Sequence, residues 1–122
     1  MTSLVPWLSI SNAAQAIQFY KAAFNAIEVY RLEGDGVIAR LSVEGAEFWV
    51  AESAQPPFNG SIRMILTVAH PDTLFAQALA AGATQISPVS EDHGWHLGRL
   101  ADPFGLHWEI GRPTSESTTE HL

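Results

Sequence analysis

The sequence predicts an α+β fold built from two copies of one strand–helix–three-strand unit, in which each helix covers one face of its four-stranded sheet. Three observations support this prediction: the order of strand and helix patterns, an internal repeat, and turns rich in glycine and proline. The length of 122 residues suits one domain. We expect that domain over residues 1–113 and a disordered tail over 114–122. Within the domain we expect module one at about 4–53, a linker at 54–60 and module two at about 61–112.

Module one opens with an apolar strand that leads into an amphipathic helix. Ser11 and Asn12 can cap the start of that helix, and Asn25 tolerates the left-handed conformation that ends many helices. Apolar and polar residues alternate over 37–43, which predicts a half-buried strand. The elements expected in module one are strand 5–10, helix 13–24 and strands 27–32, 37–43 and 46–51.

Module two repeats this order. Pro71 suits the first position of a helix, and Gly82 suits the residue that closes one. The segment 102–105, Asp-Pro-Phe-Gly, has the composition of a turn. The elements expected in module two are strand 62–68, a helix that begins at Pro71, and strands 84–89, 95–101 and 106–110.

The two modules align with each other as sequences. Leu8-Ser-Ile10 falls on Leu66-Thr-Val68, and Gly45 falls on Gly105, which aligns Phe48-Trp49 with Trp108-Glu109. In each module the helix must cover one face of its sheet, because a sheet needs at least one buried face. The opposite faces are then free to curve around a shared cleft, where we expect a ligand.

Composition excludes several classes of protein. Thirteen carboxylates against six lysines and arginines give a formal charge of −7, whereas nucleic-acid binding needs clustered basic residues. No apolar run is long enough to span a membrane, and the first residues lack the pattern of a secretory signal. The absence of cysteine excludes disulfides, thiolate metal sites and a cysteine nucleophile. We expect a cytoplasmic protein whose acidic surface keeps it soluble and can steer a cationic ligand inward.

Six segments carry a family resemblance. They are 5–10 (VPWLSI), 16–20 (AIQFY), 23–26 (AFNA), 80–83 (AAGA), 98–105 (GRLADPFG) and 107–110 (HWEI). They resemble the vicinal-oxygen-chelate superfamily, which contains glyoxalase I, extradiol dioxygenases and the bleomycin-resistance proteins. The resemblance covers residues 5–111 and implies a glyoxalase/bleomycin-resistance-type domain. In such a domain, paired βαβββ modules form a cupped, eight-stranded mixed sheet with the helices on the outside, and the protein is usually a homodimer.

The resemblance also implies where metal ligands would stand, and the sequence departs from that pattern. Metal-using members place a ligand on the first and last strand of each module, which here gives Val5, Trp49, Arg63 and Glu109. Valine and tryptophan do not coordinate divalent metals, and arginine stays protonated and is repelled by a cation. Only Glu109 can be a ligand, so we expect neither a metal nor another cofactor.

Strand alternation predicts which residues line the cleft. The candidate ligand-binding residues are Trp7, Arg40, Glu47, Trp49, Arg63, Ile65, Trp95, Arg99, His107 and Glu109. Arg63 and Glu109 are expected to face each other across the cleft, where the pair either braces the sheet or anchors a polar ligand group. The tryptophans either stack on a flat ligand or pack on one another or at a dimer interface.

The histidines give a weaker signal. His93 falls in the loop 91–94, where exposure is expected, and His96 has the opposite parity to Trp95 and should face away from the cleft. His107 shares a face with Glu109 and is the one candidate ligand or general base, although a lone histidine is more often structural.

Three functional hypotheses follow. The first is a metal-independent protein that sequesters a small aromatic molecule, as the bleomycin-resistance branch does, with no catalytic residue. The second is a lyase, isomerase or dioxygenase of the glyoxalase type, whose metal would be held by Glu109, His107 and Glu47. The third is a dimeric interaction unit whose cleft is filled by its own side chains.

Overall fold

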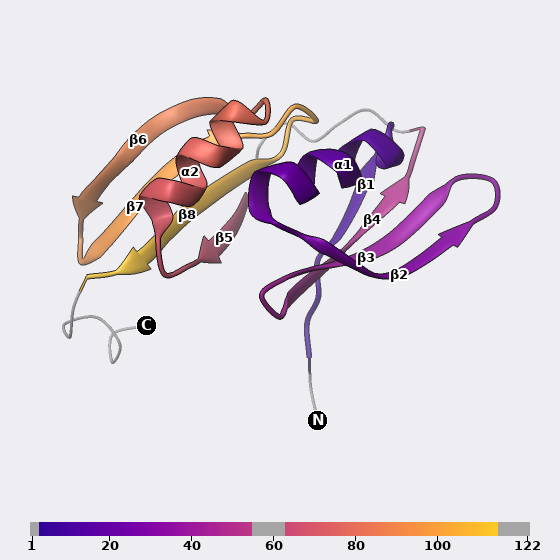
Figure 1. Cartoon of the computed structure of the whole chain (residues 1–122), viewed down its shortest axis with the longest axis horizontal. Helices are drawn as coiled ribbons and strands as arrows, with labels where there is room; N and C mark the ends of the chain where they lie inside the picture. Colours follow the sequence, from indigo (N-terminus) through magenta and orange to yellow (C-terminus); the bar gives the residue numbers. More distant parts are fainter. Residues whose placement is uncertain (1–2, 55–62, 115–122) are drawn as a thin grey trace. The chain divides into compact units, whose positions relative to one another are not determined.

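The computed structural model describes residues 3–54 and 63–114. The chain divides into two compact units, residues 1–57 (unit 1) and 58–122 (unit 2), and each contains one helix and one four-stranded sheet (Figure 1). Most of the expected linker and all of the expected tail beyond residue 114 lie outside the described residues. No helix in the described ranges is long and apolar enough to cross a membrane.

Unit 1 has the expected order of one strand, one helix and three strands. Its elements are β1 (Trp7–Ile10), α1 (Ala13–Phe24), β2 (Ile27–Glu33), β3 (Val37–Val43) and β4 (Ala46–Glu52). The sheet order is β1-β4-β3-β2. β1 runs parallel to β4, and the other pairs are antiparallel.

Unit 2 has the same topology. Its elements are β5 (Arg63–Thr67), α2 (Pro71–Ala80), β6 (Thr84–Asp92), β7 (Trp95–Ala101) and β8 (His107–Pro113). The sheet order is β5-β8-β7-β6, with β5 parallel to β8. The predicted α+β class and the two βαβββ modules are therefore confirmed, with the eight strands in two mixed four-stranded sheets.

The ends of α1 follow the sequence signals. Asn12 accepts a hydrogen bond from the backbone N–H of Gln15 at 3.3 Å, and Asn25 adopts a left-handed φ of 60°. The buried stripe of the helix includes Ile17, Tyr20 and Phe24. These side chains cover one face of the sheet, where they meet Leu8, Ile10, Ala39, Leu41, Phe48 and Val50.

Unit 2 is covered by α2 in the same way. Pro71 opens the helix, and Gly82 follows its end with a positive φ of 124°. Phe75 and Ala78 are buried, as are the helix-facing residues Leu66, Leu100, Trp108 and Ile110 of the sheet. This alternation leaves the odd-numbered residues of β5 and β8 on the face opposite α2.

Some strand bounds differ from the expected ones. β6 extends to Asp92 and β8 to Pro113, because the β6–β7 and β7–β8 ladders continue to Trp95, which pairs with both residues. β1 begins only at Trp7, after Pro6, whose carbonyl accepts from the N–H of Trp49 at 2.9 Å.

Candidate functional site

All ten predicted residues lie on the face of their sheet that is opposite the unit's own helix. The residues directly before and after them in each strand point toward the helix, where the buried core residues of both units lie. Unit 1 contributes Trp7 from β1, Arg40 from β3, and Glu47 and Trp49 from β4. Unit 2 contributes Arg63 and Ile65 from β5, Trp95 and Arg99 from β7, and His107 and Glu109 from β8.

On the face opposite α1, aromatic rings form a cluster around Trp49. Trp7, its register partner on the parallel strand, stacks on Trp49 with ring centroids 5.7 Å apart and 28° between the planes. Tyr30 of β2 contacts Trp49 edge-on at 5.8 Å, and the Arg40 guanidinium lies 5.2 Å from the ring centroid of Trp49. Trp7 is 52% exposed and Tyr30 is 49% exposed, so much aromatic surface faces outward.

Sequence reasoning missed Tyr30. The β2–β3 register shifts between Glu28 and Tyr30, so simple alternation from Ile27 assigns Tyr30 to the helix side. Counting backwards from the turn between Glu33 and Val37 instead places Tyr30 opposite Arg40, and this signal was available in the sequence.

An arginine occupies the same position in both units. Arg40 pairs in register with Trp49, and Arg99 pairs in register with Glu109, which is the repeat equivalent of Trp49. Each arginine contacts the residue two positions before that partner. Arg40 Nε forms an ion pair with Glu47 Oε1 at 2.5 Å, and Arg99 Nη2 lies 2.8 Å from His107 Nδ1.

The Arg99 contact fixes the tautomer of His107. A guanidinium only donates hydrogen bonds, so Nδ1 of the imidazole accepts, and the hydrogen of the neutral ring is on Nε2. His107 therefore presents one N–H donor and has no free lone pair in this arrangement. A metal ion would have to displace either Arg99 or the Nε2 hydrogen.

Arg63 and Glu109 form an ion pair at 2.6 Å, but its position differs from the expected one. The two residues stand on β5 and β8, which are adjacent strands of one sheet, and not across a cleft. The Glu109 side chain is 15% exposed and that of Arg63 is 48% exposed. Beside them, Ile65 takes the place that Trp7 has in unit 1, as the register partner of the last-strand residue.

Trp95 belongs to unit 2. It borders a hollow of about 270 Å³ near the β6–β7 hairpin, lined by Ser87, Pro88, Ser90, Asp92, His93, Trp95 and Leu97. Of the other two histidines of this region, His93 lines this hollow and His96 does not. His93 is in the exposed hairpin turn, and His96 faces the helix side, where Nε2 lies 3.0 Å from Asp72 of α2.

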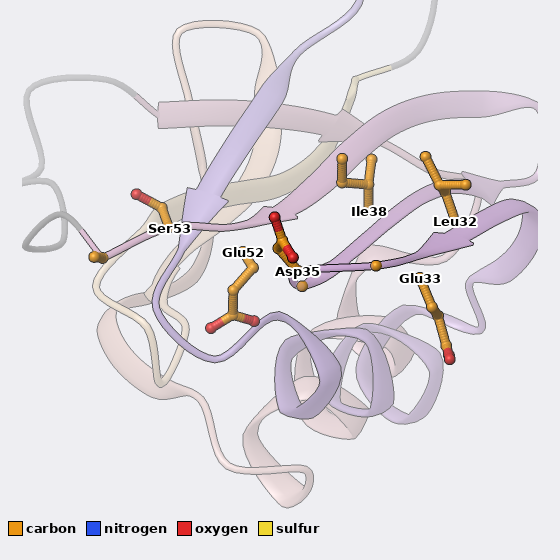
Figure 2. A pocket seen from close by; sticks show the side chains of 9 residues that line it. Leu32, Glu33, Asp35, Ile38, Glu52 and Ser53 are labelled. Carbon is orange, nitrogen blue, oxygen red and sulfur yellow. The ribbon is translucent and has the colours of Figure 1, made fainter.

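A larger hollow of about 680 Å³ lies at the β2–β3 hairpin and the end of β4 (Figure 2). It is lined by residues 32–36, Ile38 and residues 52–54, and none of them is a predicted site residue. Figure 2 shows Leu32 and Ile38 on one side of the ribbon and Glu52 pointing toward α1. Glu52 accepts a hydrogen bond from the first N–H of that helix, Ala13, at 3.1 Å, so this carboxylate has a structural partner.

Metal ligands do not gather within the described ranges. Across residues 3–54 and 63–114, no three histidine, aspartate or glutamate side chains are placed to hold one ion. Of the three residues considered for a metal, His107 and Glu109 each contact an arginine in unit 2, and Glu47 pairs with Arg40 in unit 1.

Comparisons with known proteins agree on the family. Residues 7–111 match the model of the glyoxalase-like domain. An uncharacterized protein of Mycobacterium bovis is 34% identical, over 98% of this chain and 89% of its own length. Among solved structures, TioX from Micromonospora sp. ML1 is 22% identical with a TM-score of 0.75, over 96% of this chain and 100% of TioX.

A second solved structure widens the range of functions on this fold. The fosfomycin resistance protein FosX from Listeria monocytogenes is 14% identical with a TM-score of 0.79, over 94% of this chain and 96% of FosX. A variant of FosX has been crystallised with manganese(II). The repeat, the two βαβββ units and the match over residues 7–111 together show that this chain belongs to the glyoxalase-like domain family of the vicinal-oxygen-chelate superfamily.

Proposed function

We propose that this protein binds and sequesters a small aromatic molecule without a metal, in the manner of antibiotic-resistance binding proteins. The observation that carries this proposal is the stacked pair of Trp7 and Trp49 on the face opposite α1. Half of the Trp7 surface remains exposed although large apolar side chains are usually buried. An exposed, stacked indole pair is a surface on which a further flat ring can stack.

The groups around the pair suit such a ligand. Tyr30 adds an edge-on ring, and Arg40 adds a guanidinium whose charge is balanced by Glu47. Ligand sites usually combine apolar and aromatic walls with a few placed polar groups. The face opposite α1 has this composition within a single unit.

Metal independence rests on the chemistry of the donor set. Of the four family positions, Val5, Trp49 and Arg63 cannot hold a divalent cation, and Glu109 is paired with Arg63. The alternative is a metal-dependent lyase, isomerase or dioxygenase of the glyoxalase type. It is favoured by the common face of His107 and Glu109 on β8, but both side chains are already bonded to arginines.

The proposal is tested by removing the rings. We expect Trp7→Ala and Trp49→Ala to weaken binding of flat two- and three-ring compounds by about 1–3 kcal/mol, the loss typical of one stacking contact. Equilibrium dialysis is the suitable measurement, because the variants remove the fluorophores themselves. The compounds would be quinoline, naphthalene and acridine derivatives.

Two control variants separate stacking from general effects. Trp49→Phe keeps a ring and should retain part of the affinity. Ile86→Ala removes an exposed apolar side chain of β6 in unit 2 and should change nothing. Equal affinities in the wild type and both alanine variants would refute the aromatic site.

We further propose that the protein acts as a cytoplasmic homodimer that pairs through β2. This edge strand exposes Ile27, Val29, Tyr30 and Leu32. An apolar edge strand is a template for pairing with another chain. The equivalent edge strand of unit 2, β6, exposes only Ile86 among its large apolar side chains. It also carries Pro88, which cannot donate a ladder hydrogen bond, and two register shifts against one in β2.

The sequence of β2 is also self-complementary. If two copies pair antiparallel about a two-fold axis between Val29 and Tyr30, Glu28 of each copy lies opposite Arg31 of the other, and Ile27 lies opposite Leu32. Residues that lie opposite each other in two paired strands must point to the same face of the sheet. The bulge after Glu28 meets this condition, because it places Ile27 and Leu32 on one face. Opposite charges and apolar pairs across strands are stabilising.

A further inference from the structure

Arg99 differs from the other arginines on these sheet faces in its charge balance. Arg40 is paired with Glu47, and Arg63 is paired with Glu109. Arg99 instead contacts the ring nitrogen of His107, and it forms no ion pair within the described part of the chain. Its Nε is buried without a hydrogen-bond partner. The Arg99 guanidinium therefore keeps a full, uncompensated positive charge on the face opposite α2.

The neighbours of Arg99 do not cancel its charge. The pair of Arg63 and Glu109 is neutral as a whole. His107 is a neutral acceptor for Arg99 through Nδ1, and its Nε2–H therefore points away from the guanidinium. A guanidinium without an acidic partner is suited to bind a carboxylate, because charge-assisted hydrogen bonds are the strong ones.

An apolar surface continues from Arg99 along the same strand. Leu97 and Trp95 are the next two residues of β7 on this face, and same-face neighbours on a strand are about 7 Å apart. Both side chains line the hollow of about 270 Å³ at the β6–β7 hairpin. A group bound at Arg99 would thus leave an attached apolar body over Leu97 and Trp95.

We propose that unit 2 contains a site for a small aromatic carboxylate, with the acid group on Arg99 and the ring over Leu97 and Trp95. The inference rests on the proposed function as a ligand-binding protein and names a ligand class for it. It uses only residues of unit 2, whereas the aromatic cluster belongs to unit 1, so the two can fail separately.

The formal charge of −7 does not oppose this ligand class. Exposed charges farther away than the Debye length, about 8 Å at physiological ionic strength, are largely screened. At contact distance the local balance decides, and the Arg63, Glu109 and Arg99 side chains together carry one net positive charge. The acidic surface affects the approach of the ligand more than its final contacts.

The test compares 1-naphthoate with its neutral amide, 1-naphthamide, by calorimetry on the full chain. The wild type is expected to bind the acid at least tenfold more tightly than the amide. Arg99→Gln should abolish this preference, while Arg99→Lys keeps a charge and should retain part of it. Arg112→Gln is the matched control. It removes the same charge from an exposed arginine of β8 that lies on the helix side of the sheet, away from Arg99.

Three results would overturn the inference: equal affinity of the wild type for acid and amide, no binding of the acid at all, or an unchanged preference in Arg99→Gln. If Trp49→Ala loses aromatic binding while Arg99→Gln behaves as the wild type, the proposed function stands and the carboxylate site does not.

Discussion

Asp102 is the residue that holds the turn before β8 together. Its Oδ1 accepts the backbone N–H groups of Phe104 and Leu106 at 2.9 and 3.0 Å, and its Oδ2 accepts the indole N–H of Trp108 at 2.9 Å. The residue is 4% exposed. The Asp-Pro-Phe-Gly segment carries much of the family resemblance. Its role in this structure is to hold the turn and to fix the indole of Trp108 on the helix side.

Removing this carboxylate should destabilise unit 2. We expect Asp102→Ala to lower the free energy of unfolding by about 3 kcal/mol, because buried N–H donors lose their acceptor. Asp35→Ala, in the exposed β2–β3 turn, is the control and should change it by less than about 0.5 kcal/mol. Urea denaturation followed by circular dichroism measures both. Similar stabilities of the two variants would contradict the anchoring role.

Single residues of the candidate site were predictable to different degrees. Period-two alternation was enough to assign the face of Trp7, Trp49 and Glu109, because β1, β4 and β8 contain no bulge. Tyr30 was missed because of the register shift in β2. The equivalence of Arg40 and Arg99 was missed because the spacing to the register partner differs by one residue. Trp49 follows Arg40 by nine positions, whereas Glu109 follows Arg99 by ten.

At the scale of elements, β2 and β6, two of the four edge strands of these sheets, are the informative pair. They are equivalent by the repeat, yet β2 exposes four large apolar side chains where β6 exposes only Ile86. On its inner side, β2 is tied to α1 by Lys21, which binds Glu28 at 2.6 Å. The hydrogen bond from Lys21 lowers the pKa of the Glu28 carboxyl, and Arg31 adds to this effect. Pairing with Arg31 of a second copy would therefore compete with the contacts that Glu28 makes to Lys21 and Arg31 of its own chain.

A charge at the centre of β2 should separate the dimer. We expect Val29→Lys to convert a wild-type dimer to a folded monomer, because it places two lysines beside the two-fold axis, each opposite Tyr30 of the other copy. Ile86→Lys places the same charge on β6, whose Ile86 is also exposed, and should leave the dimer intact. Sedimentation equilibrium at micromolar concentrations distinguishes these states. A monomeric wild type, or a dimeric Val29→Lys, would show that β2 is not the interface.

The lengths of the strands were less predictable than their existence. The bounds of α1, β3 and β7 agree with their residue patterns, because caps and alternation mark both ends. β6 and β8 run further than expected, because pairing with a neighbouring strand can extend a strand through residues such as Pro113 that have no strand propensity of their own.

At the scale of the whole molecule, the repeat explains why both units have a hollow at the same place. The larger hollow involves Leu32 and Ile38, and the smaller one involves Ser90 and Leu97, which are the register pairs at equivalent positions of the two hairpins. The fold class followed from the repeat. The hollows did not, because they depend on the side chains present at each hairpin.

The same repeat separates the chemical character of the two units. The face opposite α1 is aromatic and its charges are balanced, whereas the face opposite α2 has arginines, one histidine and one carboxylate. A divalent metal needs several carboxylate or imidazole ligands. The four family positions hold Val5, Trp49, Arg63 and Glu109, and only Glu109 is of this kind. The whole account therefore depends on ligand binding that needs no metal.

The most direct test is a calorimetric titration of the chelator-treated protein with a flat aromatic compound, repeated after addition of Mn²⁺, Ni²⁺, Zn²⁺ or Fe²⁺. We predict the same dissociation constant with and without metal, and no stoichiometric metal binding in the micromolar range. Aromatic binding that appears only with a bound metal would contradict the account and would support the glyoxalase-type enzyme, with His107 and Glu109 as the first residues to replace.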